Sequence, residues 1–381
     1  MDKKNINSLI LPETNEAGAI AYFYGFFPIK PPAIAKRDLE LTKNFKFDFL
    51  AKEKSAITHL YFEQKMMAEP QPVMFYCEHP FPESKEKKKN SKLDCSLFAL
   101  GSSKSVIECL SIQTAISILN KLGYKDLTVN LNSIGDKESI VEFNRKLLGF
   151  VRKNMNSFPP ELRQLAKKDI YAVLSQDKKE WQCHLNDCPK SIDFLSEQSR
   201  NHFKEVLEFL EIMDIPYVIN HNLVGDINIG AETIFDIREN DEILATGMRF
   251  NRLAKKIGYK KDLPSSIVHI EAKIKKPLKK TKIKKTIPKF YLVQFGPEAK
   301  LKSFLILKHF YKANIPITHS IAKDKLGSQI GIAENSGSSY VVLIGQKEAI
   351  ENSVIMRSTA TRAQESVPIN EIGTKIKDMI K

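Results

Sequence analysis

The spacing of hydrophobic residues predicts a mixed antiparallel core in the first 272 residues of the chain. Residues 14–27 predict a helix, and the PIKPPAI segment after it predicts a strand or edge segment. Apolar positions at helical spacing predict helices at 56–67 and at 105–122, the second ending at Gly123. Short apolar or alternating runs predict strands at 71–77, 97–100, 127–131, 217–219, 233–237 and 267–270, and ILATGMRFNRLAKKIG predicts a strand end that runs through Gly247 into a helix. A charged stretch interrupted by prolines lies between the predicted strands at 127–131 and 217–219, and it predicts a helical insertion at about 137–215.

The pattern changes after residue 289, where predicted strands alternate with predicted helices. Strands are expected at 290–295, 317–320, 340–344 and 354–357, and helices at 297–313, 325–336 and from 369. Such alternation predicts a small α/β domain with a mixed or parallel sheet. The lysine-rich segment at 273–288 contains Pro277 and Pro288, so we interpret it as a linker between a core at 1–272 and a second domain at 289–381.

Composition narrows the function. The 381 residues carry a formal charge of +14, which favours a polyanionic partner such as RNA, with no DNA expected. No apolar run is long enough to span a membrane, and the first residues lack the apolar core of a signal peptide. The five cysteines are odd in number and scattered, so we expect a reducing cytoplasm and not a disulfide framework.

The segment CHLNDC offers the one cluster of metal-binding residue types that the sequence itself suggests, at Cys183, His184 and Cys188. Structural zinc usually takes four ligands in two close pairs, and no second pair lies nearby. We therefore expect no metal site, with idle thiols as the simpler interpretation.

Several long segments together resemble the histidyl-tRNA synthetase family, a class II aminoacyl-tRNA synthetase family. They read PQPVMFY from Pro70, LTVNLNSIGDKES from Leu127, SEQSRNHFKEVLEFLEIMDIPYVINHNLV from Ser196, GSQIGIAENSGSSYVVLIGQKE from Gly327 and SVPINEI from Ser366. The resemblance implies an α+β fold, in which a class II synthetase-like antiparallel sheet with a helical insertion precedes an anticodon-binding-like α/β domain. It also implies a homodimer that takes part in translation.

The resemblance fails at the positions that carry the family's chemistry. Arginines expected in motif 2, in the histidine-specific segment and in motif 3 are replaced by Pro82, Gly225 and Ala272. The segment LVGDINIGAETIFDI, from Leu223, keeps a strand-and-bend pattern but has Ile229 and Gly230 where the family has two tyrosines. Fixed guanidinium groups hold phosphates far better than mobile lysines, so these losses predict little histidine activation.

Other family positions give candidates for a remaining substrate pocket. The resemblance places six residues there, with Asp94 replacing a glutamine and Phe250 a tyrosine: Glu53, Ser55, Asp94, Arg249, Phe250 and Glu271. Phe98 stands where a glutamate would pair with the histidine ammonium group. ATP and Mg²⁺ are expected as cofactors only if ligase activity survives.

The resulting interpretation is a synthetase-like pseudoenzyme that binds tRNA or another RNA. Candidate RNA contacts combine one residue carried over from the family, Gln329, with basic residues chosen by charge: Lys85, Lys87, Lys88, Lys89, Lys323, Lys325 and Arg357. Two alternatives remain open. One is a divergent but active histidine–tRNA ligase, and the other is a regulatory subunit like that of ATP phosphoribosyltransferase, which the presence of residues 289–381 disfavours.

Overall fold

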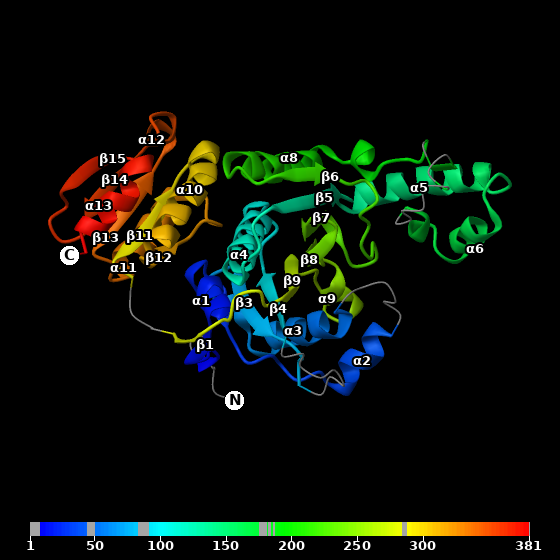
Figure 1. The fold of residues 1–381 in the computed structure, drawn as a ribbon, viewed down its shortest axis with the longest axis horizontal. Coiled ribbons are helices and arrows are strands. Elements are labelled where there is room, and N and C mark those ends of the chain that lie inside the picture. Colours follow the sequence, from blue (N-terminus) through cyan, green and yellow to red (C-terminus); the bar gives the residue numbers. More distant parts are fainter. Residues whose placement is uncertain are drawn as a thin grey trace.

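An eight-stranded sheet forms the centre of the molecule (Figure 1). The computed structural model describes residues 8–43, 50–82, 91–174, 181, 184–185, 187–283 and 288–380. The strands, in spatial order, are β2 (Phe27–Pro28), β3 (Val73–Glu78), β4 (Lys92–Leu100), β9 (Ser265–Lys273), β8 (Glu242–Arg249), β7 (Ala231–Glu239), β5 (Leu127–Ser133) and β6 (Tyr217–Ile219). Neighbours are antiparallel except at the two edges, so the predicted antiparallel sheet is confirmed.

Helices cover both faces of this sheet. One face carries α1 (Glu16–Phe23), α4 (Val106–Leu122) and α8 (Glu197–Ile212), whose buried residues join one large apolar cluster with the strands. The other face carries α3 (Ala51–Glu63) and α9 (Leu253–Lys256), while α2 (Lys36–Thr42) packs against α3. The α4 helix ends at Gly123, whose φ of 105° is the left-handed conformation expected of a terminating glycine.

The helical insertion is smaller than the sequence predicted. Helices α5 (Lys137–Asn154) and α6 (Pro160–Lys168) project from one end of the sheet and form their own core around residues such as Phe143, Leu147 and Leu162 (Figure 1). In contrast, α8 lies along the sheet and buries Val206 and Phe209 in the main core. Although this segment is rich in charged residues, its apolar residues recur at helical spacing and form one stripe along α8. Because that stripe packs on the sheet, α8 is part of the central domain.

The segment after β9 was expected to be a linker, and part of it forms a strand. Residues Lys280–Lys282 (β10) pair antiparallel with Glu13–Asn15 (β1) at the start of the chain. Backbone hydrogen bonds are available to any residue other than proline, so a lysine-rich segment can still add to a sheet edge. Residues 284–287 lie outside the described part of the chain.

The C-terminal domain is a mixed α/β layer, as predicted. Strands β11 (Phe290–Gln294), β12 (Ile317–His319) and β13 (Tyr340–Ile344) are parallel, and β14 (Ser353–Ser358) and β15 (Gln364–Pro368) continue the sheet antiparallel. Helices α10 (Pro297–Ala313), α11 (Leu326–Asn335), α12 (Gln346–Ile350) and α13 (Ile372–Asp378) flank it. The hydrophobic pattern did not predict β15, which is mostly exposed, or the five-residue α12.

The two domains share a continuous apolar core. The Phe209 ring of α8 lies 4.5 Å from the Phe304 ring of α10, and Phe23 of α1 lies 5.5 Å from Tyr311. An ion pair between Lys104 and Asp324 closes the same interface. In the described part of the chain, none of the helices combines the length and apolarity that a bilayer span requires.

Candidate functional site

The sheet face beneath α3 carries two cross-strand rows that form the floor of the candidate site. Residues directly opposite each other in antiparallel strands point to the same face. The first row is polar and runs through Asp236, Thr246, His269 and Ser96. The second row is apolar and runs through Ile234, Met248, Ile267, Phe98 and Phe75. A ligand on this floor would meet hydrogen-bonding groups on one side and hydrocarbon on the other.

The segment with Gly225 lies over the apolar row. A Cβ atom added to Gly225 would lie 3.0 Å from Cδ1 of Ile234 and 3.4 Å from Cε of Met248. The expected strand entry here is a loop, and β7 begins only at Ala231. Asp226 builds a tight turn, since its backbone oxygen accepts from the amide of Gly230 at 2.7 Å. A Cβ at Gly230 would lie 2.9 Å from that same oxygen, so the turn requires glycine.

A lysine that the sequence analysis did not single out reaches this apolar row. Lys54 of α3 is fully buried, with Nζ 3.3 Å from Sδ of Met248 and 5.8 Å from the centre of the Phe250 ring. It lies between two predicted pocket residues, Glu53 and Ser55, which provided the only signal for it. These contacts place an ammonium group among the apolar side chains at the base of this site.

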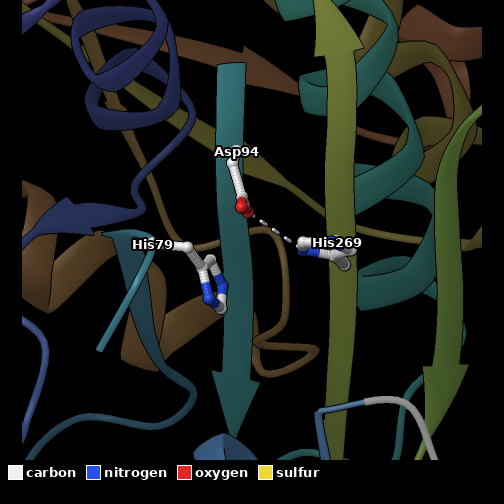
Figure 2. Close-up of side chains that lie close together, drawn as sticks. All are labelled: His79, Asp94 and His269. Atoms are coloured by element: carbon white, nitrogen blue, oxygen red, sulfur yellow. Dashed lines mark ion pairs between the residues drawn. The ribbon is translucent and has the colours of Figure 1, made fainter. Parts of the chain in front are cut away.

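His79, Asp94 and His269 lie together at the other side of the floor, where β3, β4 and β9 meet (Figure 2), and Ser96 completes a polar cluster with them. His79 follows β3 and is 4% exposed; its Nε2 lies 2.8 Å from Oγ of Ser96. That Oγ lies 3.3 Å from Nδ1 of His269, and His269 lies 3.9 Å from Oδ1 of Asp94. The Phe81 ring stacks on His79 at 5.0 Å and fixes its orientation.

Burial, together with the charges of His269 and Lys52, lowers the pKa of His79 from 6.5 to about 3. The His79 imidazole is therefore neutral at neutral pH. No sequence motif indicates this cluster, because His79 and His269 are far apart in the chain. Only the β4–β9 register brings Ser96 and His269 together.

Among the predicted pocket residues, Arg249 lies on the sheet face opposite to the candidate site. It is fully buried on the helix side of the sheet, where Nε and Nη2 donate to the Glu108 carboxylate at 2.7 and 2.6 Å. Its remaining donors bind the carbonyl oxygens of Ser102 and Lys104. Burial pulls the pKa of Glu108 upward, but Arg249 and His202 outweigh it and hold this pKa at about 2. Arg249 therefore holds α4 to the sheet and is not placed to contact a ligand.

The other predicted pocket residues are scattered. Ser55 donates to Oδ1 of Asp38 at 2.7 Å and ties α3 to α2. Glu271 lies at the rim and forms an ion pair with Lys92 at 2.7 Å. Glu53 is buried beside Lys52, Phe250 is buried next to Lys54, and Asp94 alone of the predicted pocket residues belongs to the polar cluster. Of the positions where an arginine was expected, Ala272 is buried in the core on the opposite face, and Pro82 ends the described segment after β3.

The predicted RNA contacts differ in their exposure to solvent. Gln329 is fully buried, and its amide nitrogen donates to the carbonyl oxygens of Gln294 and Lys323 while its oxygen accepts from the Gln294 amide. Because these bonds occupy the side chain inside the domain, Gln329 is not available to RNA. Lys325 is exposed, and Lys323 and Arg357 are half-exposed. The predicted contacts that lie outside the described residues are Lys85, Lys87, Lys88 and Lys89.

Of the CHLNDC segment, Cys183 also lies outside the described residues. Cys188 is a half-buried free thiol packed against the core of the insertion, and the His184 ring lies 6.3 Å from that of Phe158. The described residues of this segment therefore contribute to packing.

A cleft of about 1520 Å³ lies away from the sheet floor, between the two domains. Its walls come from α1, residues 69–74, the segment around β10 and the C-terminal domain. Among the described residues, four lysines line it, of which Lys121 is paired with Glu16 at 2.9 Å: Lys121, Lys282, Lys312 and Lys323. The cleft thus has basic groups on both domains.

Comparisons with known proteins agree with this architecture. The family model described as "Anticodon binding domain" matches residues 299–379. Histidine–tRNA ligase of Dehalococcoides mccartyi is 25% identical over 289 residues, which cover 74% of this chain and 69% of that protein. Histidine–tRNA ligase 1 of Shouchella clausii is 22% identical over 340 residues, which cover 86% and 80% respectively.

A solved structure shows the same fold. The apo histidyl-tRNA synthetase of S. aureus superposes with a TM-score of 0.52 at 19% identity, covering 95% of this chain and 94% of that one. The chain thus has the fold of that histidyl-tRNA synthetase. Its sequence is similar to histidine–tRNA ligases at 22–25% identity, and its C-terminal residues match the anticodon-binding family model.

The buried His79 should make the folded state sensitive to acid. Its pKa is about 3 when folded and 6.5 in the reference state, so between these values the unfolded chain binds the extra proton. The contribution of His79 is therefore fully present above pH 6.5 and falls as the pH drops toward 3, by up to about 1.4 kcal/mol per pH unit. Urea unfolding of the parent and of His79→Gln from pH 7 to 4 measures it. We expect the parent to lose stability faster than the variant, and parallel pH profiles would contradict this assignment.

Proposed function

We propose that this histidyl-tRNA synthetase-family protein binds RNA and does not activate histidine efficiently. The observation that carries the proposal is the apolar row beneath Gly225. Activation of an amino acid by ATP needs fixed cations around the phosphates as charge develops in the transition state. The floor instead presents Ile234, Met248 and Phe98 at this place.

Lys54, which reaches the apolar row, is not an equivalent replacement for an arginine. Lys54 carries one compact charge and lies against Met248 and Phe250, whereas a guanidinium group presents a planar fork of donors to a phosphate. The side chain of Arg249 is fully used in holding Glu108 and two backbone carbonyls. These placements support a site that has kept its shape and lost its phosphate-binding groups.

RNA is the ligand that the rest of the molecule supports. The C-terminal domain matches an anticodon-binding family, and the relatives with the same architecture are named for ligation of histidine to tRNA. The net charge of +14 and the lysines on both walls of the interdomain cleft would attract phosphates. We further propose a homodimer in the cytoplasm, as the family resemblance implies; sedimentation velocity tests the dimer, and a monomer would contradict it.

Removing the cleft lysines should reduce the salt dependence of RNA binding. In the triple variant Lys282→Gln, Lys312→Gln, Lys323→Gln, we expect the slope of log K against log salt to fall by about 0.7–0.9 for each lost phosphate contact. The matched control is Lys146→Gln, Lys153→Gln, Lys167→Gln, which removes the same charge from exposed positions on α5 and α6. Filter binding of an unmodified tRNA transcript at several salt concentrations provides the slopes. Equal slopes for the two variants would place the RNA elsewhere.

Histidine-dependent exchange of pyrophosphate into ATP tests the catalytic half of the proposal. We expect exchange at the background rate. Robust exchange would instead establish a divergent active ligase, and co-purification with a phosphoribosyltransferase would favour a regulatory subunit.

A further inference from the structure

The polar cluster on the sheet floor has the composition of a transition-metal site. His79, Asp94 and His269 each offer one ligand atom, and these atoms all lie within 4.8 Å of one another (Figure 2). They come from the end of β3, from β4 and from β9, three neighbouring strands of one sheet. We propose that these three residues bind one zinc ion on the sheet floor of the candidate site.

The backbone holds the three residues in place. The amide of His79 donates to the carbonyl oxygen of Asp94 at 3.0 Å, so the two residues are joined across β3 and β4. His269 lies opposite Ser96, two residues along β4 from Asp94. Sites on sheet strands are more precisely fixed than sites on loops, and a metal site requires this precision.

Only a small rearrangement separates this geometry from zinc coordination. Zinc binds imidazole nitrogen and carboxylate oxygen at about 2.0–2.2 Å, so ligand atoms in a tetrahedral site lie about 3.4 Å apart. His79 is held by Phe81 and is almost inaccessible. The side chains of Asp94 and His269 are 38% and 17% exposed, which leaves them room to rotate toward His79 by the remaining distance of about 1 Å.

Ser96 completes the cluster as a supporting group. Its fully buried hydroxyl lies within hydrogen-bond distance of both imidazoles. These contacts direct Nε2 of His79 and Nδ1 of His269 toward the same point, and a zinc ion bound by these nitrogens would replace their hydrogen bonds to Ser96.

The chemistry of the ligand set selects the ion. Two imidazoles and one carboxylate suit zinc and other late transition metals, whereas Mg²⁺ and Ca²⁺ prefer oxygen ligands. Three protein ligands leave a fourth position for water or for an anionic group of a ligand in the cleft. Two lysines near the cluster are paired with carboxylates, Lys52 with Glu53 at 3.8 Å and Lys92 with Glu271 at 2.7 Å.

Metal titration of the full chain tests the proposal without any assay of catalysis. The chain is first freed of metal with a chelator and then titrated with ZnCl₂ by calorimetry, and with CoCl₂ by absorption spectroscopy. We expect one zinc per chain, and a cobalt spectrum with ligand-field bands but no thiolate charge-transfer band. That spectrum distinguishes this site from one built on the cysteines of CHLNDC.

Two variants and two controls give the test its specificity. Asp94→Asn preserves volume and removes the charge, and His269→Asn removes an imidazole that is partly exposed; each should weaken zinc binding at least about 100-fold. His309→Asn in the C-terminal domain and Cys188→Ser should bind zinc like the parent. Thermal melting in the presence of chelator checks that each variant folds. If His269→Asn does not fold, the zinc affinity of Asp94→Asn alone tests the proposal. The proposal is overturned if the parent binds no zinc at micromolar concentration, or if Cys188→Ser abolishes binding while Asp94→Asn retains it.

Discussion

Replacing Glu108 by alanine is expected to destabilise the folded chain by about 3–5 kcal/mol. The substitution leaves the Arg249 guanidinium fully buried without its carboxylate, and an uncompensated buried charge has a cost of this size. His202 loses the same partner, since its Nε2 lies 2.6 Å from Oε1 of Glu108. Chemical denaturation followed by circular dichroism measures the loss.

A matched surface variant separates this effect from the general loss of a carboxylate. Glu208→Ala removes the partner of Lys204 on the exposed side of α8, where an ion pair contributes about 0–1 kcal/mol. The double variant Glu108→Leu, Arg249→Met removes both charges and should be more stable than Glu108→Ala alone. If Glu108→Ala is no worse than Glu208→Ala, Arg249 is not the buried structural group described here and returns to the set of ligand contacts.

The second large effect is expected at Gly247 of β8. A Cβ atom there would lie 2.2 Å from Cζ of Phe235, and that ring is buried against the helices. Gly247→Ala therefore forces the ring out of its position, and overpacking of this kind has a cost of about 1–3 kcal/mol. Thermal and urea unfolding measure the loss.

The matched control for this substitution is Gly149→Ala on α5, where a Cβ atom meets nothing within 4 Å. It should stabilise the helix by about 0.5–1 kcal/mol, because alanine restricts the unfolded chain. The double variant Phe235→Leu, Gly247→Ala replaces the ring with a smaller side chain and should recover part of the stability lost in Gly247→Ala. A Gly247→Ala variant as stable as the parent would contradict this prediction and show that the core around Phe235 can repack to accommodate the added methyl group.

Hydrophobic periodicity was sufficient to predict most of the architecture. It located α4, α10 and every strand of the central sheet except the two-residue β2, which it gave only as an edge segment, because each of these elements buries a regular apolar face. It failed where burial is not the cause of order. The β10 strand is held by backbone pairing to β1, and β15 lies at an exposed sheet edge. The pattern also could not separate α8 from the insertion, since charge and helical spacing are similar in both.

The site was less predictable than the fold, for a physical reason. Sequence comparison identifies what a family position has become, but not where the new side chain goes. Arg249 and Gln329 both kept the residue type expected of a contact, and both are buried with their donors occupied. Conversely, Lys54 and His79 had no motif to mark them. Their positions follow from long-range strand pairing and helix packing, which no local pattern encodes.

Gly225 stands where the resembled family has an arginine, and the structure shows which side chains surround it. The loop closes over Ile234 and Met248, so the side chains nearest to this position are apolar. We therefore propose that the candidate site keeps its sheet floor, lacks the arginines that would hold ATP phosphates, and presents the polar cluster of His79, Ser96, Asp94 and His269.

Histidine-dependent exchange of labelled pyrophosphate into ATP tests this central claim most directly. The reaction should contain the full chain, ATP, Mg²⁺ and histidine, with an active histidine–tRNA ligase as the positive control and omission of histidine as the blank. Removing one preorganised donor already reduces a rate by about 10²–10³, so the loss of three predicts exchange indistinguishable from the blank. Exchange within about tenfold of the positive control, dependent on histidine and abolished in Lys54→Met, would contradict the account.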